Sequence, residues 1–256
     1  TGVQTCALPI FGPQLLEPWI VFTGENDPRL EQLRSEYPGA LWDQEIACIP
    51  AAKANAVFRL RDLELCLGGA PAIQPQHGRQ YALGWDIGRL VDPSAWVLLD
   101  DQYQIGQTGI RPMRETHEDG ARICGKITRM FNASLMVDST GGGKGGSSRK
   151  DQDSVVEEYR RAVPGLREWV FTTNNKRRLV EYLGLLIERH SLRIPPQCRD
   201  LYEQLANYEY SRSGDQTRYH GPGGHDDDLV SGLGMAAWMQ KVGWCRKPTG
   251  RMPLTA

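Results

Sequence analysis

The chain has 256 residues, of which 40% are hydrophobic and 24% are charged, as in an ordinary globular domain with room for a substantial core. The net charge of −1 excludes nucleic-acid binding driven by the charge of the whole chain, so any DNA-binding surface must come from local clusters of basic residues. No apolar run reaches the ~18 residues of a membrane span. The six cysteines form no CxxC pair, which argues against a zinc site or a disulfide framework and favours a reducing cytoplasm.

The first ten residues, TGVQTCALPI, do not fit the rest of the chain. They have neither the basic start nor the long apolar centre of a signal peptide. They resemble the translation of a sequencing-library adapter, so we exclude residues 1–10 from fold reasoning. We expect the natural sequence to begin near Phe11, partway through a longer polypeptide.

Residues 11–78 are irregular in pattern. Short helices are expected at 27–38 and 41–50, the amphipathic stretch 57–67 is ambiguous, and the Gly- and Pro-rich stretch 68–78 is typical of a linker. We therefore expect a linking segment over 11–78, a domain over 79–243 and a tail over 244–256.

From residue 79 onward, strands and helices follow one another closely. Strands are predicted at 81–88, 94–101 and 102–110, and then at 133–140, 168–173 and 192–195. Helices are predicted at 116–132, 152–163 and 175–191, then from 201 into a hairpin with its turn near Gly214, and finally at 226–242. Three consecutive strands followed by alternating helices and strands predict a mixed α/β sheet, antiparallel first and parallel afterwards, flanked by helices.

The glycine-rich stretch after the strand at 133–140 is not a nucleotide-binding loop. A Walker loop needs GxxxxGK followed by Ser or Thr. Here Lys144 is followed by Gly145, and Asp138 stands where the leading glycine should be. Because no other segment has the pattern, we expect no ATPase activity from this chain.

Acidic residues occur at three positions that a sheet could bring together. In the first strand, alternation puts Gly84, Asp86 and Gly88 on one face, and glycines beside a carboxylate often mark close approach of a ligand or of another backbone. Asp138 ends the fourth strand, at the sheet edge where binding groups gather. Each of these two aspartates has an alternative interpretation, as a residue that simply begins a turn.

The third position is the run of aspartates at 226–228, which opens an apolar helix. One aspartate there is an ordinary N-cap and the helix dipole favours a second, but a third adds repulsion that a divalent cation would relieve. Metal ions held by such carboxylates can activate a water and stabilise the leaving oxygen in phosphodiester cleavage.

With these acidic residues in this order, the chain resembles the nuclease domain of phage terminase large subunits, which has an RNase H-like fold. The resemblance rests on GWDIGRLVDPSA, MVDSTGGG, NKRRLVEYLGLLIERHSLRIP and HDDDLVSGLGMA in that order, and covers about residues 20–240. It implies catalytic acids at Asp86, Asp138 and Asp228, with Asp227 as a further metal ligand, although Asp226 and Asp227 remain alternatives to Asp228. Two Mg²⁺ or Mn²⁺ ions are the implied cofactors, and Asp92 is interpreted as structural.

The resemblance also implies partners and a setting. These are double-stranded DNA, the portal protein and the terminase small subunit, in the cytoplasm of an infected bacterial host. Two departures from the family stand out: its ATP-binding half is absent, and Ser231 occupies a place where the family often has another acid.

Basic residues gather in three places that could contact DNA phosphates. These are Lys144, Arg149 and Lys150 after the glycines, Lys176, Arg177 and Arg178 at a helix start, and Arg212 and Arg218 in the hairpin. The alternatives are a solvated helix face for Arg177 and Arg178, and a charged sheet edge for the hairpin.

Three functions remain open from the sequence. The first is a metal-dependent terminase endonuclease, the second is another RNase H-like nuclease such as a resolvase or an RNA-cutting enzyme, and the third is a non-catalytic docking fragment of a packaging complex.

Overall fold

The computed structural model describes residues 55–72, 74–88, 93–111, 116–140, 149–213, 216–222 and 227–247. Within these ranges it describes only the backbone of residues 149–154, 213 and 216. The expected helices at 27–38 and 41–50, the turn at Gly214 and the glycine-rich stretch 141–148 lie outside the described residues.

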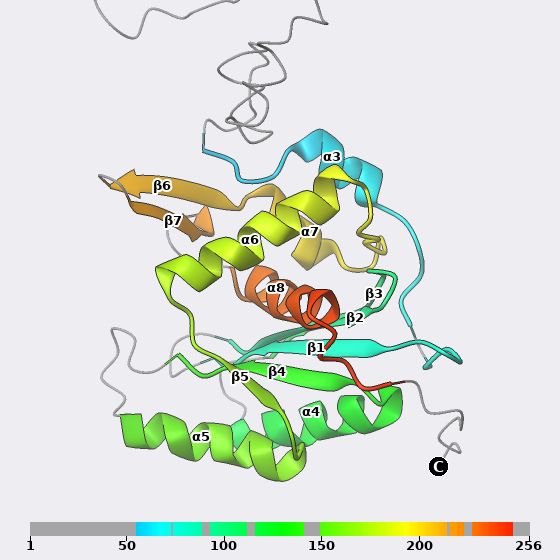
Figure 1. Cartoon of the computed structure of the whole chain (residues 1–256), viewed down its shortest axis with the longest axis vertical. Helices are drawn as coiled ribbons and strands as arrows, with labels where there is room; N and C mark the ends of the chain where they lie inside the picture. The colour runs from blue at the N-terminus through cyan, green and yellow to red at the C-terminus, as the bar shows by residue number, and fades with distance from the viewer. Residues whose placement is uncertain are drawn as a thin grey trace, which may run out of the picture.

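The centre of the fold is a five-stranded mixed sheet in the order β3-β2-β1-β4-β5 (Figure 1). Strands β1 (Tyr81–Asp86), β2 (Ala95–Asp100) and β3 (Ile105–Ile110) form an antiparallel meander. Strands β4 (Ser134–Asp138) and β5 (Arg167–Trp169) run parallel to β1 on its other side. This arrangement confirms the expected mixed α/β sheet with its antiparallel and parallel halves.

Helices cover both faces of the sheet (Figure 1). One face carries α4 (His117–Phe131) and α5 (Arg149–Ala162). The other carries α8 (Asp228–Lys241), which lies against β1 and β2 and is covered in turn by α6 (Thr173–Glu188) and α7 (Arg199–Ala206). Strands β6 (Glu209–Ser213) and β7 (Gln216–His220) form a separate two-stranded hairpin beside α6.

Strand β1 is packed differently on its two faces. Its large side chains Tyr81, Leu83 and Trp85 are buried in the core that α4 and α5 complete. On the other face Ala82 and Gly84 leave room for α8, and a Cβ atom added to Gly84 would lie 1.9 Å from the carbonyl oxygen of Gly232. Gly84, two residues before Asp86, therefore admits another backbone, which is one of the two interpretations that its sequence pattern left open.

Helix α8 is buried nearly all round because it lies between the sheet and other helices. Its buried residues run from Leu229 to Ala237 without interruption and include the polar Ser231. A helix that is apolar on every side is expected in the interior of a layered domain. Among the described residues no helix has the length and apolarity needed to cross a membrane.

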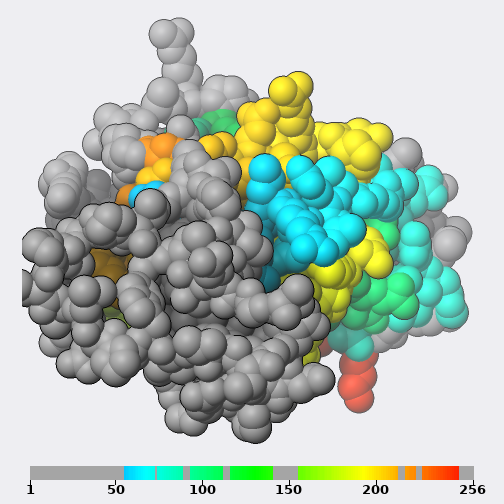
Figure 2. Space-filling view, turned by 90° about the horizontal axis from the view of Figure 1, so that it is seen from above, coloured from blue at the N-terminus to red at the C-terminus, as the bar shows by residue number. Residues whose placement is uncertain are grey.

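The observed elements differ from the expected ones in a few places. The ambiguous stretch 57–67 contains a helix, α3 (Leu60–Cys66), which lies on the surface next to α6 and α7 (Figure 2). The strand expected at 192–195 is wrong: Arg193 and Ile194 make only isolated bridges, to Gln104 and Leu67. Strand β5 is shorter than expected because its pairing with β4 ends at Trp169.

These bridges tie part of the expected linking segment to the domain. Leu63 and Cys66 of α3 are fully buried in the same core as α6, α7 and α8. The domain boundary at residue 79 stays a prediction, but residues 56–67 pack against the sheet domain rather than apart from it.

Candidate functional site

Asp86 and Asp138 end two neighbouring parallel strands at the same edge of the sheet. Trp85 of β1 pairs with Val137 of β4, and the two aspartates directly follow this pair. Adjacent strands lie about 4.8 Å apart, so the two Cα atoms are near neighbours. Met136 precedes Asp138 by two residues and belongs to the core on the α8 side. Alternation therefore directs both carboxylates toward the side of the sheet that α8 covers.

The start of α8 brings two further carboxylates to this edge. Burial raises the pKa of Asp86 well above its usual range, and the negative charges of Asp138, Asp228 and Asp227 raise it further, in that order. The Lys176 ammonium acts in the opposite direction and lowers the pKa of Asp86. Because charges shift a pKa only from nearby, the carboxylates of Asp138, Asp227 and Asp228 lie close enough to Asp86 to form one cluster of negative charge with it.

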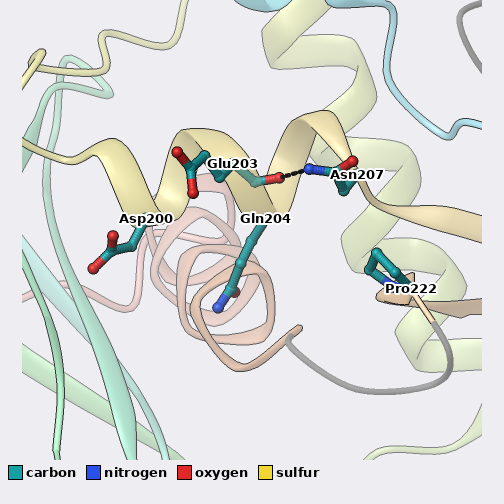
Figure 3. Close-up of a pocket in the computed structure, with 5 residues that line it drawn as sticks. All are labelled: Asp200, Glu203, Gln204, Asn207 and Pro222. Carbon is teal, nitrogen blue, oxygen red and sulfur yellow. Dashed lines mark hydrogen bonds between the residues drawn. The ribbon is translucent and has the colours of Figure 1, made fainter.

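The position of α8 is fixed by a side chain from another helix. Within the described range 227–247, Asp227 occupies the N-cap position but makes no cap hydrogen bond with its side chain. Instead, Gln204 of α7 points toward the start of α8, and its Oε1 accepts from the Leu229 N–H at 2.9 Å (Figure 3). Gln204 therefore does the work that an N-cap side chain does elsewhere, and leaves Asp227 available for other contacts.

Asp227 uses its carboxylate for a different set of contacts. Its Oδ2 accepts from the Nζ of Lys176 at 2.7 Å, in an ion pair that is partly shielded from solvent. The buried Tyr208 hydroxyl also donates to Asp227, and burial together with the Asp227 charge raises the pKa of Tyr208. Asp227 thus occupies the N-cap position without capping the helix through its side chain.

Asp138 is oriented by the turn that follows its strand. The backbone N–H of Thr140 donates to Asp138 Oδ1 at 2.7 Å, and the Thr140 hydroxyl donates to the same oxygen. The Thr140 hydroxyl also accepts from the Phe171 N–H at 2.7 Å, which ties this turn to the segment before α6. Asp138 is therefore both a turn residue and a member of the carboxylate cluster, so its two interpretations are compatible.

The donor atoms of the cluster suit a divalent cation, but among the described residues their arrangement does not form a complete metal site. Its donors are carboxylate oxygens, which Mg²⁺ and Mn²⁺ prefer, and its excess negative charge is only partly balanced by Lys176. In the described part of the chain, however, no three His, Cys, Asp or Glu side chains are arranged so that they could share one ion. The hydrogen bonds to Asp138 and the ion pair of Asp227 show how two of these carboxylates are oriented in this state.

The predicted DNA contacts have separate outcomes. Lys176 lies at the site itself, whereas Arg177 makes an exposed ion pair with Glu181 on its own helix. Arg212 stands over the ring of Tyr210 in the hairpin, with its Cζ 5.7 Å from the ring centroid. Several predicted residues lie outside the described side chains: Lys144, Arg149, Lys150, Asp92 and Asp226.

Sequence patterns did not identify three residues at the site: Thr140 and Tyr208, which contact cluster carboxylates, and Gln204, which holds the start of α8. Thr140 carries a usable signal, because a threonine two residues after a strand-end aspartate is typical of a turn in which the carboxylate accepts from the backbone. Gln204 and Tyr208 carry none, since their roles arise from contacts with α8 across the fold. Ser231, where the resembled family often has an acid, is buried one turn into α8, and its N–H donates to the Asp227 carbonyl at 2.9 Å.

No protein-family model matches the chain, and a search among curated proteins finds no relative. Solved structures do resemble it. The large terminase nuclease from thermophilic phage G20c with bound magnesium is 21% identical, with a TM-score of 0.58 over 74% of this chain and 98% of that one. The same G20c nuclease is also known with cobalt and with zinc.

A second phage nuclease gives the same result. The large terminase nuclease domain of Thermus phage P74-26 is 19% identical, with a TM-score of 0.52 over 72% of this chain and 95% of that one. At such identities the likeness concerns the fold. Since nearly the whole of each nuclease domain is matched, this chain has the RNase H-like fold of phage large terminase nuclease domains.

Proposed function

We propose that this chain is a divalent-metal-dependent DNA endonuclease, the nuclease domain of a viral packaging terminase that cuts concatemeric double-stranded DNA. One observation carries the proposal: Asp86 and Asp138 end neighbouring parallel strands, and the helix-start carboxylates Asp227 and Asp228 lie close enough for their charges to raise the pKa of Asp86. The fold that holds them is shared with terminase nucleases, of which one is known with bound magnesium.

In this proposal Asp86, Asp138 and Asp228 hold two Mg²⁺ or Mn²⁺ ions, with Asp227 as a further ligand. Such ions, when bound, supply Lewis-acid stabilisation of the attacking and leaving oxygens in phosphodiester hydrolysis. The rest of the chemistry belongs to the protein. The Thr140 hydrogen bonds orient the Asp138 carboxylate, and the anchoring of α8 by Gln204 sets the position from which Asp228 acts.

The basic side chains near the site support DNA as the substrate. Lys176 and Arg218 line one hollow beside the cluster, and Arg212 extends along the same hairpin. Contacts of this kind to phosphates are independent of base sequence and weaken with salt. The portal protein and the small subunit are the further partners we propose, in the cytoplasm of an infected bacterium.

A plasmid-nicking assay tests the function. We expect the protein to nick and linearise plasmid with Mn²⁺ or Mg²⁺ and to be inactive with EDTA. Asp86→Asn and Asp138→Asn should each lower the cutting rate at least ~100-fold, because each removes a charged ligand that a metal centre needs. Asp101→Asn is the matched control, since Asp101 lies on the turn at the opposite end of the sheet, in an exposed pair with Arg79.

Two outcomes would count against the proposal. Full activity in both site variants would show that the carboxylate cluster is not the active site. Absence of metal-dependent cutting by well-folded protein would favour a docking role instead. Faster cutting of an RNA–DNA hybrid or a four-way junction than of duplex DNA would keep the chemistry and change the substrate.

A further inference from the structure

Lys176 occupies an unusual place between the carboxylate cluster and the surface. It lies in the first turn of α6, and its ammonium pairs with Asp227 across 51 residues of sequence. The two side chains are 28% and 20% exposed, so the pair is shielded but can still be reached from solvent. An ion pair of this kind is exchangeable, because a stronger anion can approach the lysine and a stronger cation the aspartate.

The ion pair competes with a metal ion for the same carboxylate. Among the charged groups with the largest effects on the pKa of Asp86, Lys176 is the one cation. It lowers that pKa, whereas three carboxylates raise it. Its ammonium thus supplies part of the positive charge that a divalent ion would supply.

Lys176 also lines a hollow of about 320 Å³ between the start of α6 and strand β7. The chemistry of the lining suits a phosphodiester: two cations, several hydroxyl groups and two aromatic rings. The Lys176 Nζ lies 6.0 Å from the centroid of the Phe171 ring, which forms part of this lining. The lining consists of Phe171, Thr172, Thr173, Lys176, Thr217, Arg218 and Tyr219.

The arrangement in Figure 1 explains why these two sites share a residue. Helix α6 passes over α8 and reaches the β6–β7 hairpin at its first turn. A DNA backbone lying in the hollow would therefore meet the same Lys176 that pairs with Asp227. A phosphate there offers the ammonium a new partner, with Arg218 beside it as a second cation.

We propose that Lys176 is an exchangeable counter-ion that couples DNA binding to metal binding. Without DNA it pairs with Asp227. A backbone phosphate that enters the hollow takes its ammonium, and the carboxylate of Asp227 becomes available to a divalent ion. This inference rests on the proposed function of the carboxylate cluster, and it adds the phosphate hollow and the coupling between the two ligands.

Coupling of this kind is reciprocal. If DNA increases the affinity for the ion, the ion increases the affinity for DNA by the same factor, and factors of roughly 5 to 150 are usual. We therefore expect a short DNA duplex to tighten divalent-ion binding roughly tenfold.

Calorimetric titration with Ca²⁺ measures the coupling without any need for cleavage. In the wild type we expect saturating duplex to lower the apparent Kd for Ca²⁺ about tenfold. In Lys176→Met the ion should bind without DNA nearly as tightly as it binds the wild-type complex with DNA, and duplex should change its Kd less than twofold. Arg177→Met is the matched control, because Arg177 is the next residue of the same helix and pairs with an exposed glutamate. It should weaken DNA binding but keep the coupling.

A second substitution distinguishes loss of the positive charge from misfolding. Lys176→Arg keeps the positive charge and should retain most of the coupling, while thermal unfolding shows whether each variant is folded. Unchanged Ca²⁺ affinity and undiminished coupling in folded Lys176→Met would overturn the inference. So would a wild type whose Ca²⁺ affinity is the same with and without duplex. The nicking assay judges the nuclease proposal separately, since a coupled protein that does not cut would retain this inference and lose that function.

Discussion

The two faces of strand β1 differ in the size of their side chains and in what packs against them. One face carries Tyr81, Leu83 and Trp85, which fill the space beneath α4 and α5 and stabilise the fold through buried apolar area. The other carries Ala82, Gly84 and Asp86, whose small size lets α8 approach the sheet closely.

The comparison shows how a carboxylate cluster is assembled in this fold. Large side chains on one face hold the sheet in place, for example through the stacking of Trp85 on Trp96 at 5.0 Å between ring centroids. Small residues on the other face bring the start of α8 to the end of β1. The close approach, rather than any one acidic residue, is what places charges from distant parts of the sequence together.

The largest effect is expected from adding a side chain to the face of β1 that contacts α8. Gly84→Ala would put a methyl group into the backbone of α8 at Gly232. We expect a loss of about 3 kcal/mol in the free energy of unfolding, at the upper end of overpacking costs, measured by urea denaturation. Gly184→Ala is the control, because a Cβ atom at Gly184 in α6 meets nothing within 4 Å. It should stabilise the protein by up to ~1 kcal/mol. Equal stability of the two variants would refute the importance of the close approach.

The next effect concerns the charge of Asp86, on the face of β1 that contacts α8. The pKa of Asp86 is raised in the folded protein, chiefly by burial and then by its acidic neighbours. The folded state therefore holds this proton more tightly than the unfolded chain does. Its favourable contribution is fully present below the unfolded carboxyl pKa of about 3.9 and is lost as pH rises through the raised pKa.

Asp86→Asn should remove the free-energy cost of keeping a buried carboxylate charged at high pH. We expect the variant to match the wild type in stability near pH 4 and to exceed it by roughly 1 kcal/mol at pH 8, in thermal unfolding without metal. It should at the same time be inactive, so that stability and activity change in opposite directions. A variant that is less stable than the wild type at pH 8 would show that Asp86 is a structural residue.

The smallest effect is expected from the anchor of α8. Gln204→Leu removes the acceptor of the Leu229 N–H and should cost about 1 kcal/mol, as the loss of an N-cap does. Gln204→Glu keeps an acceptor and should restore most of that stability. Cutting activity should fall more in the Leu variant than in the Glu variant, since the anchor also positions Asp228. If both variants behave like the wild type, α8 is held by packing alone.

Much of the fold could be predicted from local pattern. The alternation of residues 81–88 placed Asp86 on the same strand face as Gly84, and the strand predicted at 133–140 placed Asp138 near its carboxyl end. The apolar residues after Asp228 predicted a buried helix, because burial periodicity is a property of each segment by itself. The strand expected at 192–195 failed for the same reason. Its apolar residues are buried through isolated bridges to other segments, which no local pattern can distinguish from a strand.

The sequence by itself determined most of the strands and helices, the strand face that Asp86 shares with Gly84, the place of Asp138 at the end of its strand, and the acidic run at the start of the last helix. Only the tertiary structure decided what those acids contact. Gln204 rather than Asp227 caps α8, Lys176 pairs with Asp227, and Gly84 admits the backbone of Gly232. Each of these contacts joins residues that are 25 to 148 positions apart, and only the packing of α8 between the sheet and two helices brings them together.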